Sequence, residues 1–321
     1  MPAENAIRVE NLVKTFGAIR AVDGTSFTVE RGEIFSLLGP NGAGKTTTIS
    51  ILSCLARQTS GEAWVMGHSV ASEAKAVKSA IGVVPQEVAV YKDLSALENL
   101  LFWGRMQGLS GPHLRERAEA VLAMIGLTDR RHGRVGTFSG GMVRRVNIGI
   151  ALMHAPRLLI LDEPTVGIDP QSRRHILDSV VELNRQGVTV LYTTHYMEEA
   201  QELSRHIGIM DHGKMIALGT HEELVKIVGG LDRLELTVAG EPAAVEGALS
   251  GWRGMPGVRG GSASDGRIGL LVEDADTVLP RLFESAPRGG VRITSIQVTE
   301  PNLEAVFLQL TGRALRDQGT T

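Results

Sequence analysis

Short apolar runs alternate with stretches of helical spacing up to about residue 228. Five of these runs are rich in aliphatic and β-branched residues and are typical of buried strands: 34–38, 81–84, 158–161, 188–193 and 207–210. Their alternation with helical stretches predicts an α/β domain built on a largely buried parallel sheet. Residues 94–125 keep helical spacing without a strand pattern, so we expect a helical insertion between two strands.

The pattern changes after residue 228, where glycine becomes frequent and 13 of the 38 glycines fall within 229–290. It predicts, in order, a strand (234–238), a helix (242–249), a hairpin across 260–266, a strand (267–272), a helix (276–285) and a strand (291–298). This βαββαβ order suggests a small ferredoxin-like unit. A last helix is expected after Pro301, with Asn302 as its N-cap. We therefore expect two domains, 1–228 and 229–321.

Composition narrows the classes of function. The 321 residues carry 33 basic and 36 acidic side chains, a net charge of -3, and 4% aromatics. A net charge this close to zero argues against a nucleic-acid-binding surface, and few aromatic side chains are present to stack on bases. The single cysteine, Cys54, excludes an internal disulfide framework and fits a reducing compartment. The sequence has neither a signal-peptide pattern nor a run of roughly 20 apolar residues, so we expect any membrane role to come through a partner.

A glycine-rich loop follows the first apolar run and precedes a helical stretch. Its residues are Gly39, Pro40, Asn41, Gly42, Ala43, Gly44, Lys45, Thr46 and Thr47. The glycines let backbone N–H groups converge on an anion, and the following helix points its positive end at the same place. Lys45 would reach the β- and γ-phosphates of a nucleotide, and the Thr46 hydroxyl would join the shell of a Mg²⁺ ion.

Two carboxylates, Asp162 and Glu163, end the apolar run at 158–161. Parallel strands deliver such side chains to the carboxyl edge of the sheet, where ligands bind. Asp162 is expected to hold Mg²⁺ and its waters. Since consecutive strand residues face opposite ways, Glu163 is expected to act instead as the general base for the attacking water.

For three further sites, the residues alone allow two interpretations each. His195 follows the run at 188–193 and could contact a γ-phosphate oxygen, or it could be an ordinary surface or core histidine. Gln86 could be an oxygen ligand to Mg²⁺ on a movable loop, or a neutral amide without a role. Ser139, Gly140 and Gly141 start a helix and expose N–H groups, which makes either an ordinary capped helix or an anion site for a nucleotide held by another subunit.

Taken together, these motifs resemble those of the ATP-binding-cassette (ABC) ATPases over residues 7–228. In that family the phosphate loop is followed in order by a glutamine loop (here 84–86), a helical subdomain, a Ser-Gly-Gly motif, an Asp-Glu strand end, a loop here reading Gly167-Ile168-Asp169, and a switch histidine. The resemblance implies an antiparallel β subdomain beside the parallel-rich sheet and a helical subdomain at about 87–155. It also implies a role for Glu163 and His195 in hydrolysis, with ATP and Mg²⁺ as cofactors.

The same resemblance implies a head-to-tail dimer in which two protomers share each ATP. The loop at 39–47 of one protomer and Ser139 to Gly141 of the other would enclose the same nucleotide, with Asp169 beside them. Phe16 matches the position whose ring stacks on adenine, where most relatives have tyrosine, and ring stacking needs only the face. Phe138 and Met142 replace the commoner leucine and glutamine around Ser-Gly-Gly, so the hydrogen bonds of that glutamine are missing.

A narrower resemblance is to cassettes that energise ABC-2 type exporters, including the daunorubicin-resistance group and sodium exporters. Ser-Gly-Gly-Met at 139–142, Met-Glu-Glu-Ala at 197–200 and the ending at 301–308 carry it. It implies a homodimer or paired cassette on the cytoplasmic face of the membrane, driving a separate permease that docks near Gln86 and residues 94–103. Two alternatives remain: a cassette without a transport role, and a regulator that senses a ligand through residues 230–321. We favour dimerisation or regulation for the latter region, because catalytic residues do not group in it.

Overall fold

The computed structural model describes residues 5–227, 230–264, 267–299 and 302–311. Contacts divide these residues into two compact units, one ending at His221 and one beginning at Glu222. The domain boundary predicted at 228/229 falls outside the described residues and stays a prediction.

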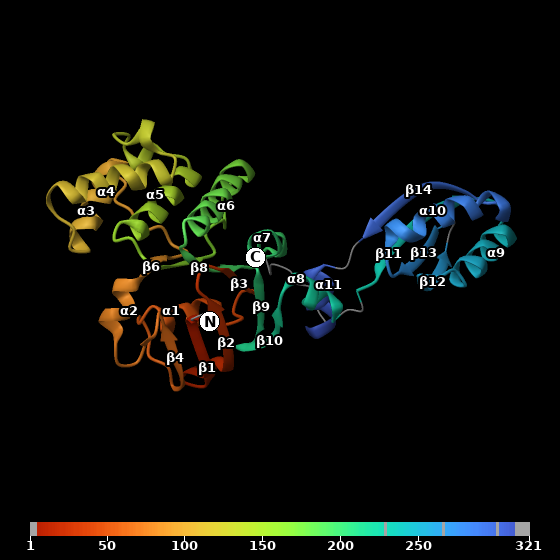
Figure 1. The fold of residues 1–321 in the computed structure, drawn as a ribbon, viewed down its shortest axis with the longest axis horizontal. Helices are drawn as coiled ribbons and strands as arrows, with labels where there is room; N and C mark the ends of the chain where they lie inside the picture. Colours follow the sequence, from red (N-terminus) through yellow and green to blue (C-terminus); the bar gives the residue numbers. More distant parts are fainter. Residues whose placement is uncertain (1–4, 228–229, 265–266, 300–301, 312–321) are drawn as a thin grey trace. The chain divides into compact units, whose positions relative to one another are not determined.

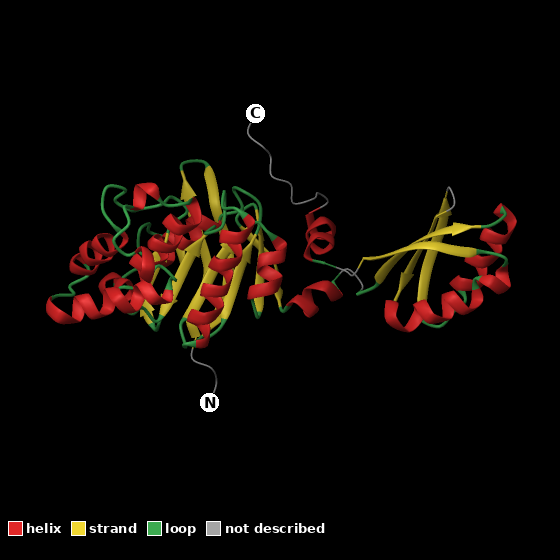
Figure 2. Ribbon diagram, turned by 90° about the horizontal axis from the view of Figure 1, so that it is seen from above, coloured by secondary structure: helices red, strands yellow, loops and turns green. Residues whose placement is uncertain are grey.

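A six-stranded sheet with the order β10-β9-β3-β8-β7-β6 forms the centre of the first unit (Figure 2). Its strands are β3 (Ile34–Leu38), β6 (Ile81–Val84), β7 (Leu158–Asp162), β8 (Thr189–Thr194), β9 (His206–Asp211) and β10 (Lys214–Gly219). The first five run parallel and correspond to the five predicted runs, while β10 pairs antiparallel with β9. The predicted parallel sheet is therefore confirmed.

A second, antiparallel sheet has the order β2-β1-β4-β5. It consists of β1 (Asn5–Phe16), β2 (Ile19–Glu30), β4 (Ser60–Val65) and β5 (His68–Ser69). This sheet is the antiparallel β subdomain that the family resemblance implies. The apolar pattern alone did not reveal it, because long half-exposed strands such as β1 alternate in burial instead of forming a continuous apolar run.

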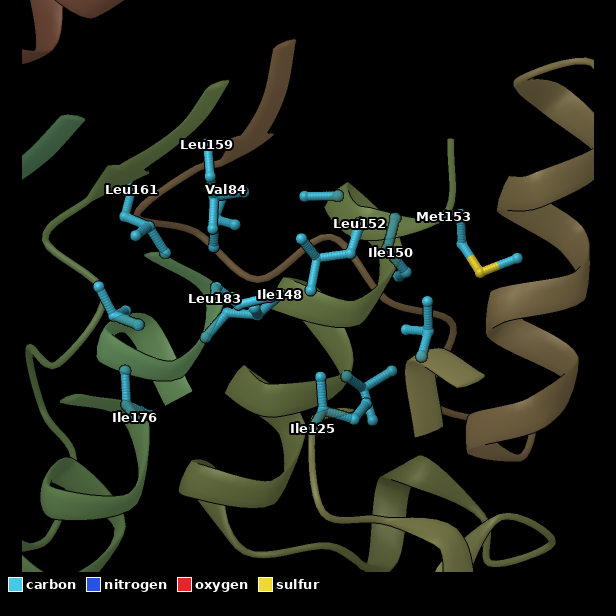
Figure 3. Packing of buried hydrophobic residues seen from close by; sticks show 14 of the residues in the cluster. Val84, Ile125, Ile148, Ile150, Leu152, Met153, Leu159, Leu161, Ile176 and Leu183 are labelled. Carbon is cyan, nitrogen blue, oxygen red and sulfur yellow. The ribbon is translucent and has the colours of Figure 1, made fainter. Parts of the chain in front are cut away.

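Side chains that alternate along the central strands build two separate cores. Leu158 and Ile160 of β7 join a core with α1 (Lys45–Leu52), α2 (Ala74–Ala80) and the antiparallel sheet. Leu159 and Leu161 point to the opposite core, with α3 (Ala96–Met106), α4 (Gly111–Met124), α5 (Gly140–Leu152) and α6 (Pro170–Arg185). Figure 3 shows side chains of β6, β7, α5 and α6 meeting in this second core. Helix α5 is thereby packed against β7, the strand that ends at the predicted carboxylates.

The predicted helical insertion consists of α3 and α4, followed by short 3-10 turns at Thr128–Arg130 and Val135–Thr137. Helix α3 begins with a capping box, since the Ser95 hydroxyl accepts from the Glu98 amide and the Glu98 carboxylate accepts from the Ser95 amide. Helices α3, α4 and α5 lie together, apart from β1 and β4 (Figure 1). The short helix α7 (Met197–Leu203) follows β8.

The second unit contains an antiparallel sheet with the order β12-β13-β11-β14. Its elements are β11 (Asp232–Ala239), α9 (Pro242–Arg253), β12 (Val258–Ser264), β13 (Arg267–Val272), α10 (Ala275–Ser285), a 3-10 turn (Pro287–Gly289) and β14 (Arg292–Thr299). Because β11 lies between the last two strands of the βαββαβ order, the topology is ferredoxin-like, as predicted. Helix α8 (His221–Lys226) begins at the last residue of the first unit and continues into the second, which also holds α11 (Leu303–Thr311). The Ala305 amide donates to the Asn302 side chain at 3.0 Å, which confirms the predicted cap of α11.

Among the described residues, every helix is too short or too polar to cross a lipid bilayer.

Candidate active site

The glycine-rich loop connects β3 to α1 and forms one wall of a cavity of about 520 Å³. Its shape requires glycine at position 44, where φ is +104° and a Cβ atom would lie 2.6 Å from the Ala21 carbonyl oxygen. The other wall comes from the start of β2 and from three distant loops. The lining residues are Ile19, Arg20, Ala21, Asn41, Gly42, Ala43, Gly44, Lys45, Thr46, Thr47, Gln86, Glu163 and His212.

Lys45 connects the loop to the end of β7. Its ammonium group donates to the carbonyl oxygens of Gly39 at 2.7 Å and Pro40 at 3.1 Å, and it lies 3.0 Å from Glu163 Oε1. Both side chains of this ion pair are almost fully buried. A buried ammonium group at an anion-binding loop attracts phosphate strongly, because the protein interior screens its charge less than water does.

Glu163 lies between Lys45 and His195, whose Nδ1 atom is 3.3 Å from Glu163 Oε2. Burial by itself would raise the pKa of the carboxyl group, but the contact with His195 and the charge of Lys45 outweigh it and lower the pKa to about 2. The carboxylate is therefore ionised. His195 and Glu163 are brought together as a pair, which favours the functional interpretation of His195 over that of an ordinary core histidine.

Asp162 and Glu163 do diverge, but strand alternation is only part of the reason. Asp162 is the last residue of β7, and its carboxylate accepts a hydrogen bond from Thr193 Oγ1 at 2.6 Å. The chain then leaves the strand, because Glu163 has a left-handed backbone with φ of +44°. Such a conformation is sparsely populated for a residue with a Cβ atom, and strain of this kind is concentrated at functional sites.

Of the remaining residues predicted to bind nucleotide or Mg²⁺ on this side, two line the cavity and one does not. Thr46 and Gln86 line the cavity together with Lys45, so their oxygen atoms are available near the loop. Phe16 is exposed at the end of β1, just before the hairpin residues that form the cavity wall, and it does not itself line the cavity. Its proposed stacking on adenine stays a prediction.

Ser139, Gly140 and Gly141 begin helix α5 and do not line the cavity around Lys45. The Ser139 hydroxyl accepts from the Met142 amide at 3.3 Å, as expected of an N-cap. Gly141 allows α5 to approach α6, since a Cβ atom there would lie 2.1 Å from Ser172 Cβ. Asp169 caps α6 in turn by accepting from the Ser172 amide at 2.9 Å. The two glycine-rich helix starts of the chain are thus separate sites.

Sequence reasoning missed two buried charged residues next to the site, Glu199 and Arg144. Glu199 accepts hydrogen bonds from three hydroxyl groups, those of Thr165, Tyr192 and Thr194, and it pairs with Arg173 at 2.7 Å. It therefore connects the residues before His195 to the loop after Glu163. Helical periodicity was the signal that could have found them. Arg144 is three residues from the buried Gly141 and Asn147, and Glu199 is four residues from the buried Leu203.

Comparison with known proteins agrees with this geometry. The model of the ABC transporter family matches residues 22–166. The chain is 48% identical to the linearmycin resistance ATP-binding protein LnrL of Bacillus subtilis, covering 97% of this chain and 100% of LnrL. It is 40% identical to the daunorubicin/doxorubicin resistance ATP-binding protein DrrA of Streptomyces peucetius (98% and 95% covered) and 37% identical to the Nod factor export ATP-binding protein I of Paraburkholderia xenovorans (98% and 99% covered).

Among solved structures, the dimeric ATP-binding cassette MJ0796 bound to ADP and Pi superposes with a TM-score of 0.60 at 27% identity, covering 67% of this chain and 98% of that one. The chain therefore belongs to the ATP-binding proteins of ABC transporters, which are ATPases, and the family and fold predicted from its motifs are confirmed.

Proposed function

We propose that this chain hydrolyses ATP held on the loop at 39–47, with Glu163 as the general base, and that hydrolysis drives a separate exporter permease of the ABC-2 type. The observation that carries the proposal is the contiguous row of polar side chains, Lys45, Glu163 and His195, beside a cavity bordered by a phosphate-binding loop. The relatives compared above are resistance and export proteins, and none of these three favours a cassette without a transport role.

The low pKa of Glu163 is compatible with a role as base. A carboxylate with a pKa of about 2 accepts protons poorly, but Lys45 is one cause of that value. A bound phosphate competes for Lys45, and a weaker Lys45–Glu163 contact raises the pKa of the carboxyl group. Glu163 would then take the proton of the attacking water as the new P–O bond forms at the γ-phosphorus and the bond to the bridging oxygen of ADP breaks. His195 would keep the carboxylate oriented.

A Mg²⁺ ion fits the residues of this site. The predicted ligands, the Thr46 hydroxyl, the Gln86 amide oxygen and the Asp162 carboxylate, are all oxygen donors, the kind that Mg²⁺ prefers. Thr46 and Gln86 border the same cavity as Lys45. When bound, the ion neutralises negative charge on the β- and γ-phosphates.

We further propose that two protomers share each ATP, the second contributing Ser139, Gly140 and Gly141. Support comes from the separation of this exposed helix start from the cavity within one chain, and from the dimeric state named for the related cassette MJ0796. Asp169 lies at the start of the neighbouring helix α6, on the proposed dimer face. Phe16 would stack on the adenine ring from the exposed end of β1.

The permease is proposed to dock in a groove of about 730 Å³ between β6, α3 and α5. Within the described residues, Trp103 Nε1 and Asn147 Nδ2 are buried N–H donors without a hydrogen-bond partner, and their residues line this groove beside Lys75 and Lys78. Buried donors that lack a partner favour an occupant carrying acceptors. We therefore expect an acidic helix of the permease here, which would keep the chain at the cytoplasmic face of the membrane.

The function is tested by measuring ATP hydrolysis and ATP binding for the full chain and for Glu163→Gln. Loss of the base should cut turnover at least about a hundredfold while ATP binding is kept. Glu198→Gln is the matched control, since Glu198 is an exposed glutamate of α7, and its turnover should stay within about twofold of wild type. Turnover near the wild-type rate in Glu163→Gln would remove Glu163 from the role of base.

The shared site is tested by mixing two inactive variants. Lys45→Ala removes the cation of the phosphate loop and should abolish nucleotide binding at that loop, while Ser139→Arg should block the helix start that faces the partner. A mixed dimer would keep one site in which both halves are intact, so hydrolysis should rise above that of either variant alone. A mixture without any gain would contradict the sharing of ATP between protomers.

A further inference from the structure

The guanidinium group of Arg144 is buried where three segments of the first unit meet. Arg144 lies one turn into α5, and only 2% of its surface is exposed. Its Nε donates to the Pro164 carbonyl oxygen at 2.7 Å, its Nη1 to the Pro85 carbonyl oxygen at 2.7 Å, and its Nη2 to the Glu163 carbonyl oxygen at 3.1 Å. One side chain therefore binds the backbone of two separate segments, the one after β6 and the one after β7.

These hydrogen bonds begin where the sheet stops. Strands β6 and β7 are paired only as far as Val84 and Leu161, and their chains then separate into two loops. Pro85 precedes Gln86 in one loop, and Glu163 and Pro164 lie in the other. Because the ladder ends at Val84, the guanidinium bridges the two loops directly beyond the last ladder pair.

Glu163 depends on this contact more than an ordinary strand residue would. Its backbone is in the left-handed region, a strained conformation for a residue with a Cβ atom that persists only where neighbouring groups enforce it. The Glu163 amide donates to the Thr193 carbonyl oxygen at 3.2 Å and to Thr193 Oγ1 at 3.1 Å. Arg144 binds the other end of the same residue through the carbonyl. The peptide groups on both sides of the Glu163 Cα atom are thus fixed, and with them the direction of the carboxylate.

Two other arginines show what a structural role looks like in this unit. Arg145, the next residue of α5, donates to the carbonyl oxygens of Ile125 and Gly126 at 3.1 Å each, just beyond α4. Arg117 donates to those of Leu152 and Met153, at the end of α5. Both cap the ends of helices, and the acceptors of these hydrogen bonds lie at the ends of α4 and α5. Arg144 differs because its acceptors belong to the loops that carry Gln86 and Glu163.

We propose that Arg144 is a positioning residue for ATP hydrolysis, which fixes the Glu163 carboxylate and the Gln86 loop relative to each other and to helix α5. The proposal rests on the proposed role of Glu163 as the base. Since α5 also begins with Ser139, Arg144 connects the helix start that would face the partner's nucleotide to the base of its own site.

The test compares Arg144→Met, Arg144→Lys and the matched control Arg145→Met in the full chain, with kcat and KM for ATP hydrolysis and a separate measurement of ATP affinity. Arg144→Met loses all three donors, so kcat should fall at least about tenfold while the ATP dissociation constant changes less than about threefold. Arg144→Lys keeps the charge and part of the hydrogen bonding and should recover an intermediate kcat. Arg145→Met should keep kcat within about twofold.

Equal kcat values for Arg144→Met and Arg145→Met would overturn the proposal, as would a loss in Arg144→Met that appears in ATP affinity and leaves kcat unchanged. If Arg144→Met does not fold, Arg144→Lys decides the question in the same way, and a kcat equal to that of wild type would count against it. Glu163→Gln, measured in parallel, separates the two hypotheses. Full activity in Glu163→Gln contradicts the proposed base, whereas loss there with a normal Arg144→Met contradicts only the positioning role.

Discussion

The two units of the chain bury different kinds of side chain. In the first unit, buried charged and hydroxyl groups such as Lys45, Glu163, Thr193 and Glu199 gather at the carboxyl ends of the central strands. In the second unit, the buried core of the described residues is hydrophobic, with Leu234, Ile268 and Trp252 as representative members. Both units contain sheets covered by helices, so the fold type alone does not account for the difference.

The first unit buries charged groups that its candidate active site requires, and this burial lowers its stability unless the groups are paired. Burying a charged group costs free energy unless it is paired and hydrogen-bonded, whereas burying apolar surface stabilises at roughly 25 cal/mol per Å². The first unit meets the cost through pairs such as Lys45–Glu163 and Arg173–Glu199. Removing one partner of such a pair should therefore be more damaging than a change of similar size in the second unit. Three predictions test this comparison.

The largest effect is expected from Glu199→Gln. The substitution keeps the shape but leaves the charge of Arg173 uncompensated beside three hydroxyl groups that lose their carboxylate acceptor. The free energy of unfolding should fall by about 3–5 kcal/mol. Urea unfolding followed by circular dichroism measures the loss, and hydrogen exchange should increase in β8 and α7. A loss no larger than that of the exposed Glu198→Gln would contradict the special cost of buried charge.

A somewhat smaller effect is expected from the pH dependence of Glu163. Its pKa is lowered from 4.5 to about 2, so the ionised pair contributes stability above pH 4.5 that is lost as the pH falls toward 2. The difference in unfolding free energy between wild type and Glu163→Gln should accordingly change by about 3 kcal/mol over this interval. Urea titrations at several pH values measure it. A difference that is constant from pH 6 to pH 2 would show that the carboxylate is not held by its neighbours.

The smallest effect is expected from Trp252→Phe in the second unit. Trp252 is buried, and its Nε1 donates to Ser285 Oγ at 2.8 Å. The change removes a single neutral hydrogen bond and some apolar surface, while the Ser285 hydroxyl keeps its bond to the Leu282 carbonyl oxygen. We expect a loss of about 1–2 kcal/mol and an unchanged rate of ATP hydrolysis per molecule. A loss as large as that of Glu199→Gln would remove the proposed contrast between the units.

Local features of the sequence predicted much of the fold. The runs that became β3, β6, β7, β8 and β9 are continuous and apolar because both faces of the central sheet are covered, and such runs can be read from composition alone. The loop at 39–47 and the Asn302 cap depend on residues close together in the chain, as does the ferredoxin-like order of the second unit. The strands β1 and β2 were not found from their pattern, since they are half exposed and interrupted by bulges.

The amino-acid sequence by itself determined the chemical groups of the site and the strand ends on which they lie. Only the tertiary structure decided which of them meet, namely that Lys45 contacts Glu163, that Arg144 bridges the Pro85 and Glu163 carbonyl groups, and that Glu199 collects three hydroxyl donors. The physical reason is that periodicity specifies the face on which a side chain lies, whereas its partners depend on the order β3-β8-β7-β6 in the sheet. That order arises from packing between segments far apart in the chain.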